Sequence, residues 1–250
     1  MDRTAEFYDT SKGDAWTRVV DLLPEEESLF HRCLDPLPKD SRILDVGTGA
    51  GRFLFQLRDR GFADLSGIDL STRLLEAARS RAAREQGKRL VFLNQSATAI
   101  GFPDGSFDVV LALQQVTSFV GEAANRERAV REYHRVLKPG GLLLLSVLHY
   151  QARWYNPILS AALLPVKILK RDFHALDRGS LPTIRLGHQF NLRYFVERQP
   201  YNHWFEIDEA RCLLSGAGFR VLDTCTSASL APQNLAMASS SMLYFIAAKG

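Results

Sequence analysis

The chain has 250 residues, of which 46% are hydrophobic, and its formal net charge is +3. This length and hydrophobic content suffice for one domain with a full core and a sizeable insertion. The charge is too small to indicate a nucleic-acid-binding protein by itself. The three cysteines, Cys33, Cys212 and Cys225, are widely spaced and odd in number, so they match neither a disulfide framework nor a zinc site.

The first residues are polar and partly acidic, unlike a secretory signal peptide. The longest apolar run after residue 150, at 157–169, contains Pro165 and Lys167 and is too short to span a bilayer. We therefore expect a cytoplasmic protein with no transmembrane segment.

Residues 1–40 are predicted to form a helical leader. Helix is expected over 4–37, with apolar residues between 16 and 23 on one side. Pro24 starts a second helix with acids in its first turn, because proline suits the first helical position. Two further prolines, Pro36 and Pro38, close the leader.

From residue 41 onward, strand and helix patterns alternate, which predicts a parallel sheet with right-handed crossovers. The expected elements are Ile43–Val46, Arg52–Arg60, Asp64–Asp69, Thr72–Glu85, Leu90–Asn94, Phe107–Leu111, Glu122–Val136 and Leu142–Val147, followed later by Ile207–Ala217, Arg220–Thr226 and Met242–Ala248.

A glycine-rich turn follows the first expected strand. Gly47, Gly49 and Gly51 come directly after Asp45, and the next strand ends in Asp69. In an open α/β sheet such glycines let the backbone approach an adenosine ligand, and the later acid accepts hydrogen bonds from the ribose hydroxyls. The pattern therefore predicts an adenosine site.

A nicotinamide dinucleotide is the main alternative ligand for this turn. Its fingerprint has a third glycine three positions after the second, where this chain has Arg52. Asp45 would also face the region of a pyrophosphate, and like charges repel. S-adenosylmethionine carries an ammonium and a sulfonium but no phosphate. The residues therefore favour a cationic adenosine ligand over NAD.

Four motifs in order resemble the class I S-adenosylmethionine-dependent methyltransferases, in particular the small-molecule group called methyltransferase domain 11. They are Asp-Val-Gly-Thr-Gly-Ala-Gly (45–51), Gly-Ile-Asp-Leu-Ser (67–71), Phe-Pro-Asp-Gly-Ser-Phe-Asp-Val-Val (102–110) and Arg-Val-Leu-Lys-Pro-Gly-Gly (135–141). The segment Ala217–Leu222 also resembles the family's C-terminal part.

The resemblance implies a Rossmann-like α/β fold, with a mostly parallel seven-stranded sheet whose antiparallel last strand inserts beside strand five. We expect a single methyltransferase domain over 1–250, built from the helical leader, a cofactor-binding core at 41–148, an inserted substrate cap at 149–205, and a C-terminal helix and strands at 206–250.

The resemblance also implies S-adenosyl-L-methionine as methyl donor and S-adenosyl-L-homocysteine as product. The implied cofactor-binding residues are Asp45, Gly47, Thr48, Gly49, Asp69, Leu70, Ser96, Ala97, Leu113, Tyr8 and Trp16. Of these, Asp45 is expected near the ammonium group. The two leader aromatics are expected to fold over the cofactor.

One position departs from the family. Where relatives usually have an Asp-Ala pair whose carboxylate takes the adenine amino group, this chain has Ser96-Ala97. A hydroxyl can still accept that hydrogen bond, but without a charge. We therefore expect Ser96 to contact adenine. Asp104 and Asp108 are expected to serve structure instead, in a turn and at the start of a strand.

The predicted cap, 149–205, has eight lysines and arginines against three acids, a net charge of +5, so the rest of the chain carries −2. It also holds ten of the 25 aromatic residues. Because α/β sheets bind ligands at their carboxyl edge, we expect it to face the substrate. The expected substrate residues are Trp154, Tyr194, Tyr201 and Trp204. The candidate catalytic bases are His149 and His203, although a lone histidine more often serves structure.

Leu113-Gln114-Gln115 follows strand four, where family members place the reacting group. No metal-binding acids and no Pro-Cys nucleophile occur there. We expect metal-independent, in-line methyl transfer to N, O or C of a small-molecule acceptor. An RNA methyltransferase using the basic cap and a non-catalytic S-adenosylmethionine-binding subunit are the alternatives. Nucleic acid is the less favoured partner, because the aromatic-rich cap lacks a dense Lys/Arg run.

Overall fold

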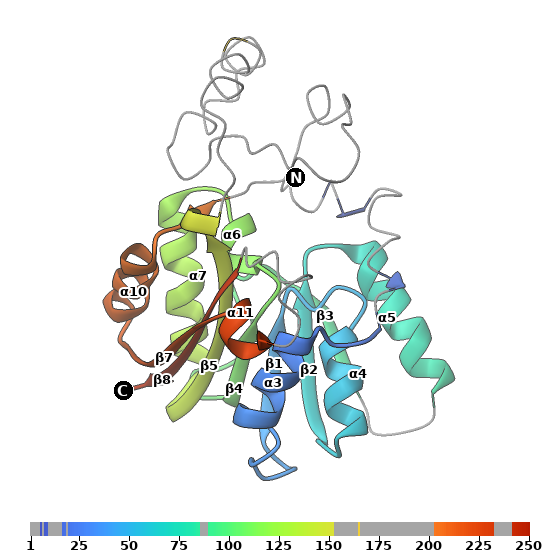
Figure 1. Ribbon diagram of the computed structural model, residues 1–250. Helices are drawn as coiled ribbons and strands as arrows, with labels where there is room; N and C mark the ends of the chain where they lie inside the picture. The colour runs from blue at the N-terminus through green and yellow to red at the C-terminus, as the bar shows by residue number, and fades with distance from the viewer. Residues whose placement is uncertain are drawn as a thin grey trace.

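The computed structural model describes residues 6, 8–9, 17–18, 20–85, 90–152, 165, 203–232 and 242–250 (Figure 1). The helices in these ranges are α3 (Pro24–Cys33), α4 (Arg52–Asp59), α5 (Thr72–Arg84), α6 (Val116–Phe119), α7 (Ala123–Val136), α10 (Ile207–Gly216) and α11 (Ser227–Leu230), with a 3-10 turn at Tyr150–Ala152. The strands are β1 (Arg42–Val46), β2 (Asp64–Asp69), β3 (Leu90–Asn94), β4 (Phe107–Ala112), β5 (Leu137–His149), β6 (Trp204–Phe205), β7 (Phe219–Thr226) and β8 (Met242–Lys249).

The described strands form one sheet in the order β3-β2-β1-β4-β5-β8-β7. Strands β1 to β5 are mutually parallel, and β8 runs antiparallel between β5 and β7. The predicted seven-stranded sheet, with the last strand inserted antiparallel beside strand five, is confirmed. The strand order reverses between β1 and β4, and such a switch point opens a crevice at the carboxyl ends of the strands.

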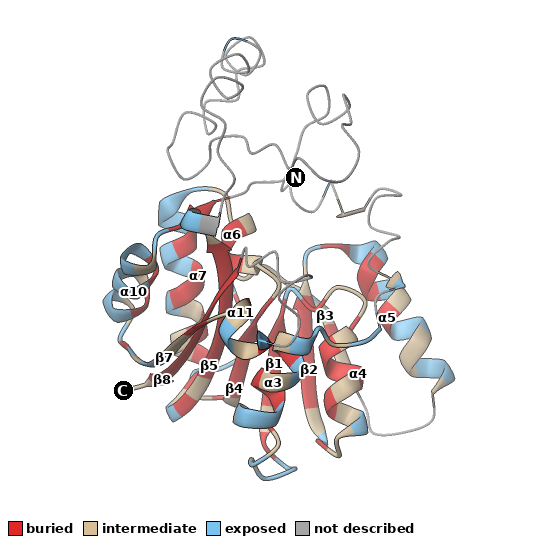
Figure 2. Ribbon diagram, viewed as in Figure 1, coloured by how far each residue is buried: buried red, intermediate tan, exposed pale blue. Residues whose placement is uncertain are grey.

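Helices cover both faces of the sheet (Figure 1). One apolar cluster joins the sheet to α3, α4 and α5, and includes Phe30, Leu54 and Leu75. The other joins it to α7 and α10, and includes Val130 and Leu214. Figure 2 shows the result: the strands are mostly buried, and the helices expose the side that faces away from the sheet. Strands β1, β4 and β8 are buried along nearly their whole length because both faces of the sheet are covered there.

Several predicted bounds differ from the structure for local reasons. Helix α3 begins at Pro24 as predicted, but it ends at Cys33 rather than at residue 37. Pro36 disfavours helical backbone at the residue before it, so the chain turns early. Strand β5 is longer than predicted and includes the Lys-Pro-Gly-Gly segment at 138–141.

The predicted cap does not extend to residue 205. Trp204 and Phe205 form β6, which pairs in parallel with the end of β5, opposite Leu148 and His149. Both side chains are buried, and Phe205 belongs to the core on the α7 side. These two residues are therefore part of the sheet, which gains an eighth short strand. Most of the remaining predicted cap lies outside the described residues.

Candidate active site

A pocket lies at the carboxyl ends of the central strands, at the switch point between β1 and β4. Its lining comes from the glycine turn and the start of α4, the end of β2, the loop after β3, the segment after β4, and Tyr8. Several residues that the sequence singled out line it. They are Tyr8, Gly47, Thr48, Gly49, Asp69, Leu70, Ser96 and Ala97.

The glycine turn is shaped by its close neighbours. The N–H groups of Gly47 and Thr48 both donate to the carbonyl oxygen of Ile68, at 2.8 and 3.0 Å, which ties the turn to the end of β2. Gly47 has φ +73°, and a Cβ there would lie 2.3 Å from Cγ2 of Val116. A side chain at this position would be strained and would also clash, so glycine is required for the turn to approach the pocket.

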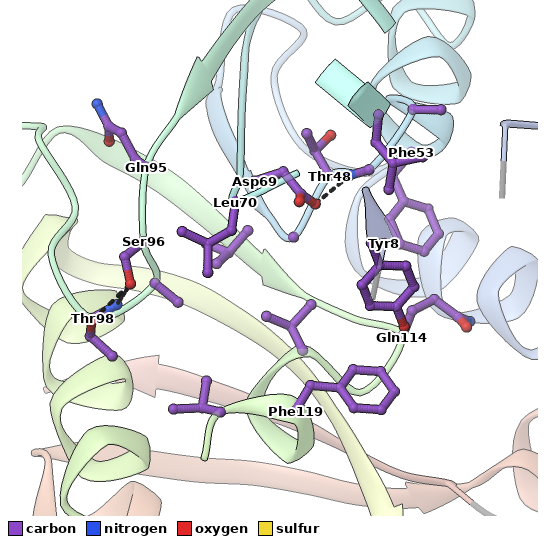
Figure 3. Close-up of a pocket in the computed structure, with 18 of the residues that line it drawn as sticks. Tyr8, Thr48, Phe53, Asp69, Leu70, Gln95, Ser96, Thr98, Gln114 and Phe119 are labelled. Atoms are coloured by element: carbon purple, nitrogen blue, oxygen red, sulfur yellow. Dashed lines mark hydrogen bonds between the residues drawn. The ribbon is translucent and has the colours of Figure 1, made fainter. Parts of the chain in front are cut away.

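Asp69 fastens the opposite side of this turn. One carboxylate oxygen accepts the N–H of Gly49 (Figure 3), and the other accepts the N–H of Ser71, both at 2.8 Å. Burial raises the pKa of Asp69 above its ordinary value, although these hydrogen bonds act the other way. Each carboxylate oxygen can accept a second hydrogen bond. Asp69 can therefore bind a vicinal diol and still hold the loop.

Asp45 lies behind the turn, on β1, and only 1% of its surface is exposed. Its Oδ2 and the Oγ1 of Thr48 are buried, and although these two side chains interact, neither of the two oxygens makes a hydrogen bond of normal geometry among the described residues. Burial raises the pKa of Asp45 to about 7. Buried polar groups without such hydrogen bonds are uncommon and call for an explanation. A cationic ligand in the adjoining pocket would balance the charge of the Asp45 carboxylate and so reduce the cost of burying it.

The loop after β3 carries Ser96 at the pocket wall. Its hydroxyl lies 2.8 Å from that of Thr98 and also accepts the N–H of Thr98 at 3.2 Å (Figure 3). The serine is therefore held by a local turn, with Thr98 and Gln95 beside it on the lining. Neither Gln95 nor Thr98 belongs to a sequence motif, so neither was predicted to line the pocket.

The other end of the pocket is aromatic. Figure 3 places Tyr8, Phe53, Gln114 and Phe119 together, away from Ser96 and Thr98. The rings of Tyr8 and Phe119 meet edge to face, with centroids 6.2 Å apart. Burial, and secondarily the charge of Asp69, raise the pKa of Tyr8 to about 12, so this phenol stays protonated at neutral pH.

The remaining predicted site residues lie elsewhere or outside the described ranges. Leu113 is buried in the core. His149 Nε2 lies 2.6 Å from Gln151 Oε1, and His203 is buried with Nε2 2.6 Å from Glu209 Oε1. Trp204 lies in β6. The pocket lining therefore includes none of the four residues Leu113, His149, His203 and Trp204. The residues outside the described ranges are Trp16, Trp154, Tyr194 and Tyr201.

The two acids expected to be structural make contacts within the fold. Asp108 accepts the N–H of Arg42 at 2.8 Å and pairs with Lys138 at 2.7 Å. Asp104, largely exposed, pairs with Arg135 at 2.7 Å. Both ion pairs lie at the end of the sheet opposite the pocket, because Asp108 starts β4 and the pocket lies beyond its end.

The sheet order, together with a glycine turn that faces an acid at the end of the next strand, is typical of class I methyltransferases. Comparison with known proteins agrees, because residues 44–145 match the family described as a methyltransferase domain. The matched segment therefore resembles a class I S-adenosylmethionine-dependent methyltransferase domain, and the match to the family is confined to residues 44–145. The match implies S-adenosyl-L-methionine as the methyl donor.

Two curated relatives show the range of this similarity. A demethylmenaquinone methyltransferase of Thermus thermophilus is 39% identical over 113 residues, which cover 45% of this chain and 48% of the relative. A 27-O-demethylrifamycin SV methyltransferase of Amycolatopsis mediterranei is 34% identical over 134 residues, covering 53% and 45%. The chain therefore spans about half the length of these curated relatives.

Solved structures support the fold over a longer part of the chain. A crystal structure of an S-adenosylmethionine-dependent methyltransferase from Methanosarcina mazei matches with a TM-score of 0.66 and 23% identity, covering 92% of this chain and 98% of that one. At this identity the likeness concerns the fold alone. Among the helices that the structure describes, none combines the length and apolar character needed to cross a bilayer.

Proposed function

We propose that this chain is an enzyme that transfers a methyl group from S-adenosyl-L-methionine to an N, O or C atom of a small-molecule acceptor in the cytoplasm. The observation that carries the proposal is Asp69, a carboxylate on the pocket wall that is held against the N–H of Gly49 in the glycine turn. The relatives are named for small molecules, demethylmenaquinone and 27-O-demethylrifamycin SV.

In this proposal the polar end of the pocket holds the donor. Asp69 binds the ribose hydroxyls, and Ser96 accepts a hydrogen bond from the adenine amino group. Gly47, Thr48 and Gly49 lie along the methionine part of the donor. The carboxylate of Asp45 balances the positive charge of the donor's ammonium group. The buried oxygens of Asp45 and Thr48, which lack hydrogen bonds of normal geometry among the described residues, support this assignment, because a cation nearby reduces the cost of burying that carboxylate.

The remaining predicted contacts are also part of the proposal. Leu70, Ala97 and Leu113 belong to the adenosine side, and Tyr8 covers the pocket together with Trp16. Trp154, Tyr194, Tyr201 and Trp204 stay proposed acceptor-binding residues, and His149 and His203 stay proposed bases. Leu113, His149, His203 and Trp204 would each need to act from outside the pocket lining described above.

The donor supplies a methyl group on a sulfonium, which a nucleophile attacks in line. The protein's part is to align the two reactants and to exclude water, which together can lower such a barrier by several kcal/mol. The aromatic end, with Tyr8, Phe53 and Phe119, supports an acceptor with apolar or aromatic surface.

Two measurements test this function. Isothermal titration calorimetry is expected to show micromolar binding of S-adenosylhomocysteine and no binding of NAD. Incubation with methyl-labelled S-adenosylmethionine and a panel of phenols, hydroquinones and amines is expected to label at least one acceptor. NAD binding without a response to S-adenosylhomocysteine would contradict the cofactor assignment. Cofactor binding without any methylation would favour a non-catalytic binding subunit.

A further inference from the structure

Glu26, on the leader helix α3, joins three parts of the pocket's surroundings. It is completely buried, and Arg52 at the start of α4 donates two hydrogen bonds to it, at 2.6 and 2.8 Å. Its Oε2 also accepts the N–H of Leu23 at 2.7 Å, and its Oε1 accepts a hydrogen bond from Nε2 of Gln114. A single carboxylate thus links the leader, the cofactor loop and the segment after β4.

This contact fixes how the Gln114 amide is turned. A carboxylate paired with arginine can only accept hydrogen bonds, so the amide nitrogen of Gln114 must face Glu26. The amide oxygen, Oε1, is then directed away from Glu26. In the part of the chain that the structure describes, Oε1 accepts no hydrogen bond and is not among the buried side-chain atoms left without a partner. The oxygen therefore keeps some exposed surface, on a residue that lines the pocket.

The backbone here is also held in an uncommon conformation. Gln114 and Gln115 have φ of +54° and +69°, in the left-handed region that non-glycine residues rarely adopt. Such conformations persist only where the surroundings enforce them, and they concentrate at functional sites. The hydrogen bond to Glu26 holds Gln114 in place. Ser146 Oγ accepts the N–H of Gln115 at 3.4 Å, and Met242 Sδ accepts its amide at 3.2 Å.

We propose that Gln114 Oε1 accepts a hydrogen bond from the hydroxyl of an aromatic methyl acceptor, and that Glu26 is the residue that positions it. This inference rests on the proposed function and names the acceptor class. The aromatic side chains of Tyr8, Phe53 and Phe119 lie at the same end of the pocket as Gln114 (Figure 3) and suit an aromatic ring.

The chemistry at this end suits a neutral phenol. Among the described lining residues the carboxylate is Asp69, which holds the glycine turn, and Tyr8 stays protonated at neutral pH. Gln114 aligns the acceptor oxygen by its hydrogen bond. That oxygen forms a bond to the methyl carbon, the bond from this carbon to sulfur breaks, and its electron pair remains on sulfur. The phenolic proton then passes to water.

Binding of phenol and of its methyl ether, anisole, to the protein saturated with S-adenosylhomocysteine tests the proposal, with ligand-observed NMR as readout. Only phenol can donate the hydrogen bond, so the wild-type protein is expected to bind phenol about two- to tenfold more tightly. Gln114→Asn tolerates the left-handed backbone but withdraws the amide, and is expected to abolish this preference. Gln115→Asn is the matched control, because it makes the same change at the neighbouring left-handed position, and is expected to keep the preference.

Glu26→Gln tests the positioning role. It keeps the shape of the side chain but puts a donor where Arg52 or Gln114 needs an acceptor, so the preference for phenol is expected to fall while affinity for S-adenosylhomocysteine stays within about threefold. Equal binding of phenol and anisole by the wild type, or an unchanged preference in Gln114→Asn, would overturn the inference even if Glu26→Gln fails to fold. If the wild-type protein does not bind S-adenosylhomocysteine, the proposed function fails first, and this inference fails with it.

Discussion

Binding of the donor is expected to release a proton from Asp45. This carboxyl is buried, its Oδ2 makes no hydrogen bond of normal geometry in the described part of the chain, and burial raises its pKa to about 7. A group with that pKa is about half protonated at pH 7. The proposed ammonium beside it favours the charged form and lowers its pKa. Complete ionisation on binding would therefore release about half a proton per ligand at pH 7.

Calorimetry of S-adenosylhomocysteine binding at pH 7, in two buffers that differ in ionisation enthalpy, measures this release. Asp45→Asn cannot release this proton, and at pH 7 the ligand's own amine is mostly protonated before it binds, so it adds little to the proton count. The difference between wild type and variant therefore isolates the contribution of Asp45. A proton count that is identical in the two proteins would refute the placement of the ammonium beside this residue.

The same carboxyl makes the stability of the ligand-free protein depend on pH. Its folded pKa lies above its ordinary value of 3.8, so it stabilises the fold fully below about pH 4. This contribution is lost as pH rises to about 7, and over about three pKa units it amounts to at most about 4 kcal/mol. Denaturant unfolding is expected to show a fall in stability between pH 4 and 7 that is absent in Asp45→Asn.

Four further outcomes are expected. Asp69→Asn removes the charge that receives the ribose hydroxyls, so affinity for S-adenosylhomocysteine should fall about ten- to a hundredfold by calorimetry, and an unchanged affinity would place the ribose elsewhere. Ser96→Asp should hold or tighten binding, because a charged acceptor is stronger, and a large loss without unfolding would contradict the adenine assignment. Gly47→Ala should cost about 1–3 kcal/mol of stability, since the new Cβ is strained and meets Val116; an unchanged melting temperature would exclude this. EDTA should leave methyl transfer intact, and inhibition reversed by added metal would reveal a metal requirement.

The alternating core was predictable because its signals are local. The sequence predicted β2 and β3 with the bounds found, Asp64–Asp69 and Leu90–Asn94. β3 is a short apolar run that ends in Asn94, whereas β2 begins and ends in an acid and is buried between them. The glycine turn was also predictable, because Gly47 adopts a backbone conformation that other residues avoid.

The acceptor end of the pocket was not predictable in the same way. Gln114 and Gln115 carry no glycine or asparagine signal for left-handed backbone, and the contact that holds Gln114 comes from Glu26, 88 residues earlier. In sequence, Glu26 looks like an ordinary acid in the first turn of a helix. The place of Trp204 in the sheet was not predictable for a related reason, since it depends on pairing with β5 across a long insertion.

The departure from the dinucleotide fingerprint now has a structural account. In that fingerprint the third glycine allows close packing of helix against strand. Here Gly51 has that role one residue earlier, because a Cβ on it would lie 2.9 Å from the ring of Phe92 on β3. Residue 52 therefore does not have to be glycine for the helix to pack on the strand, and the arginine at this position forms an ion pair with Glu26. One shift in glycine spacing thus removes a phosphate-binding pattern and connects the cofactor loop to the leader helix.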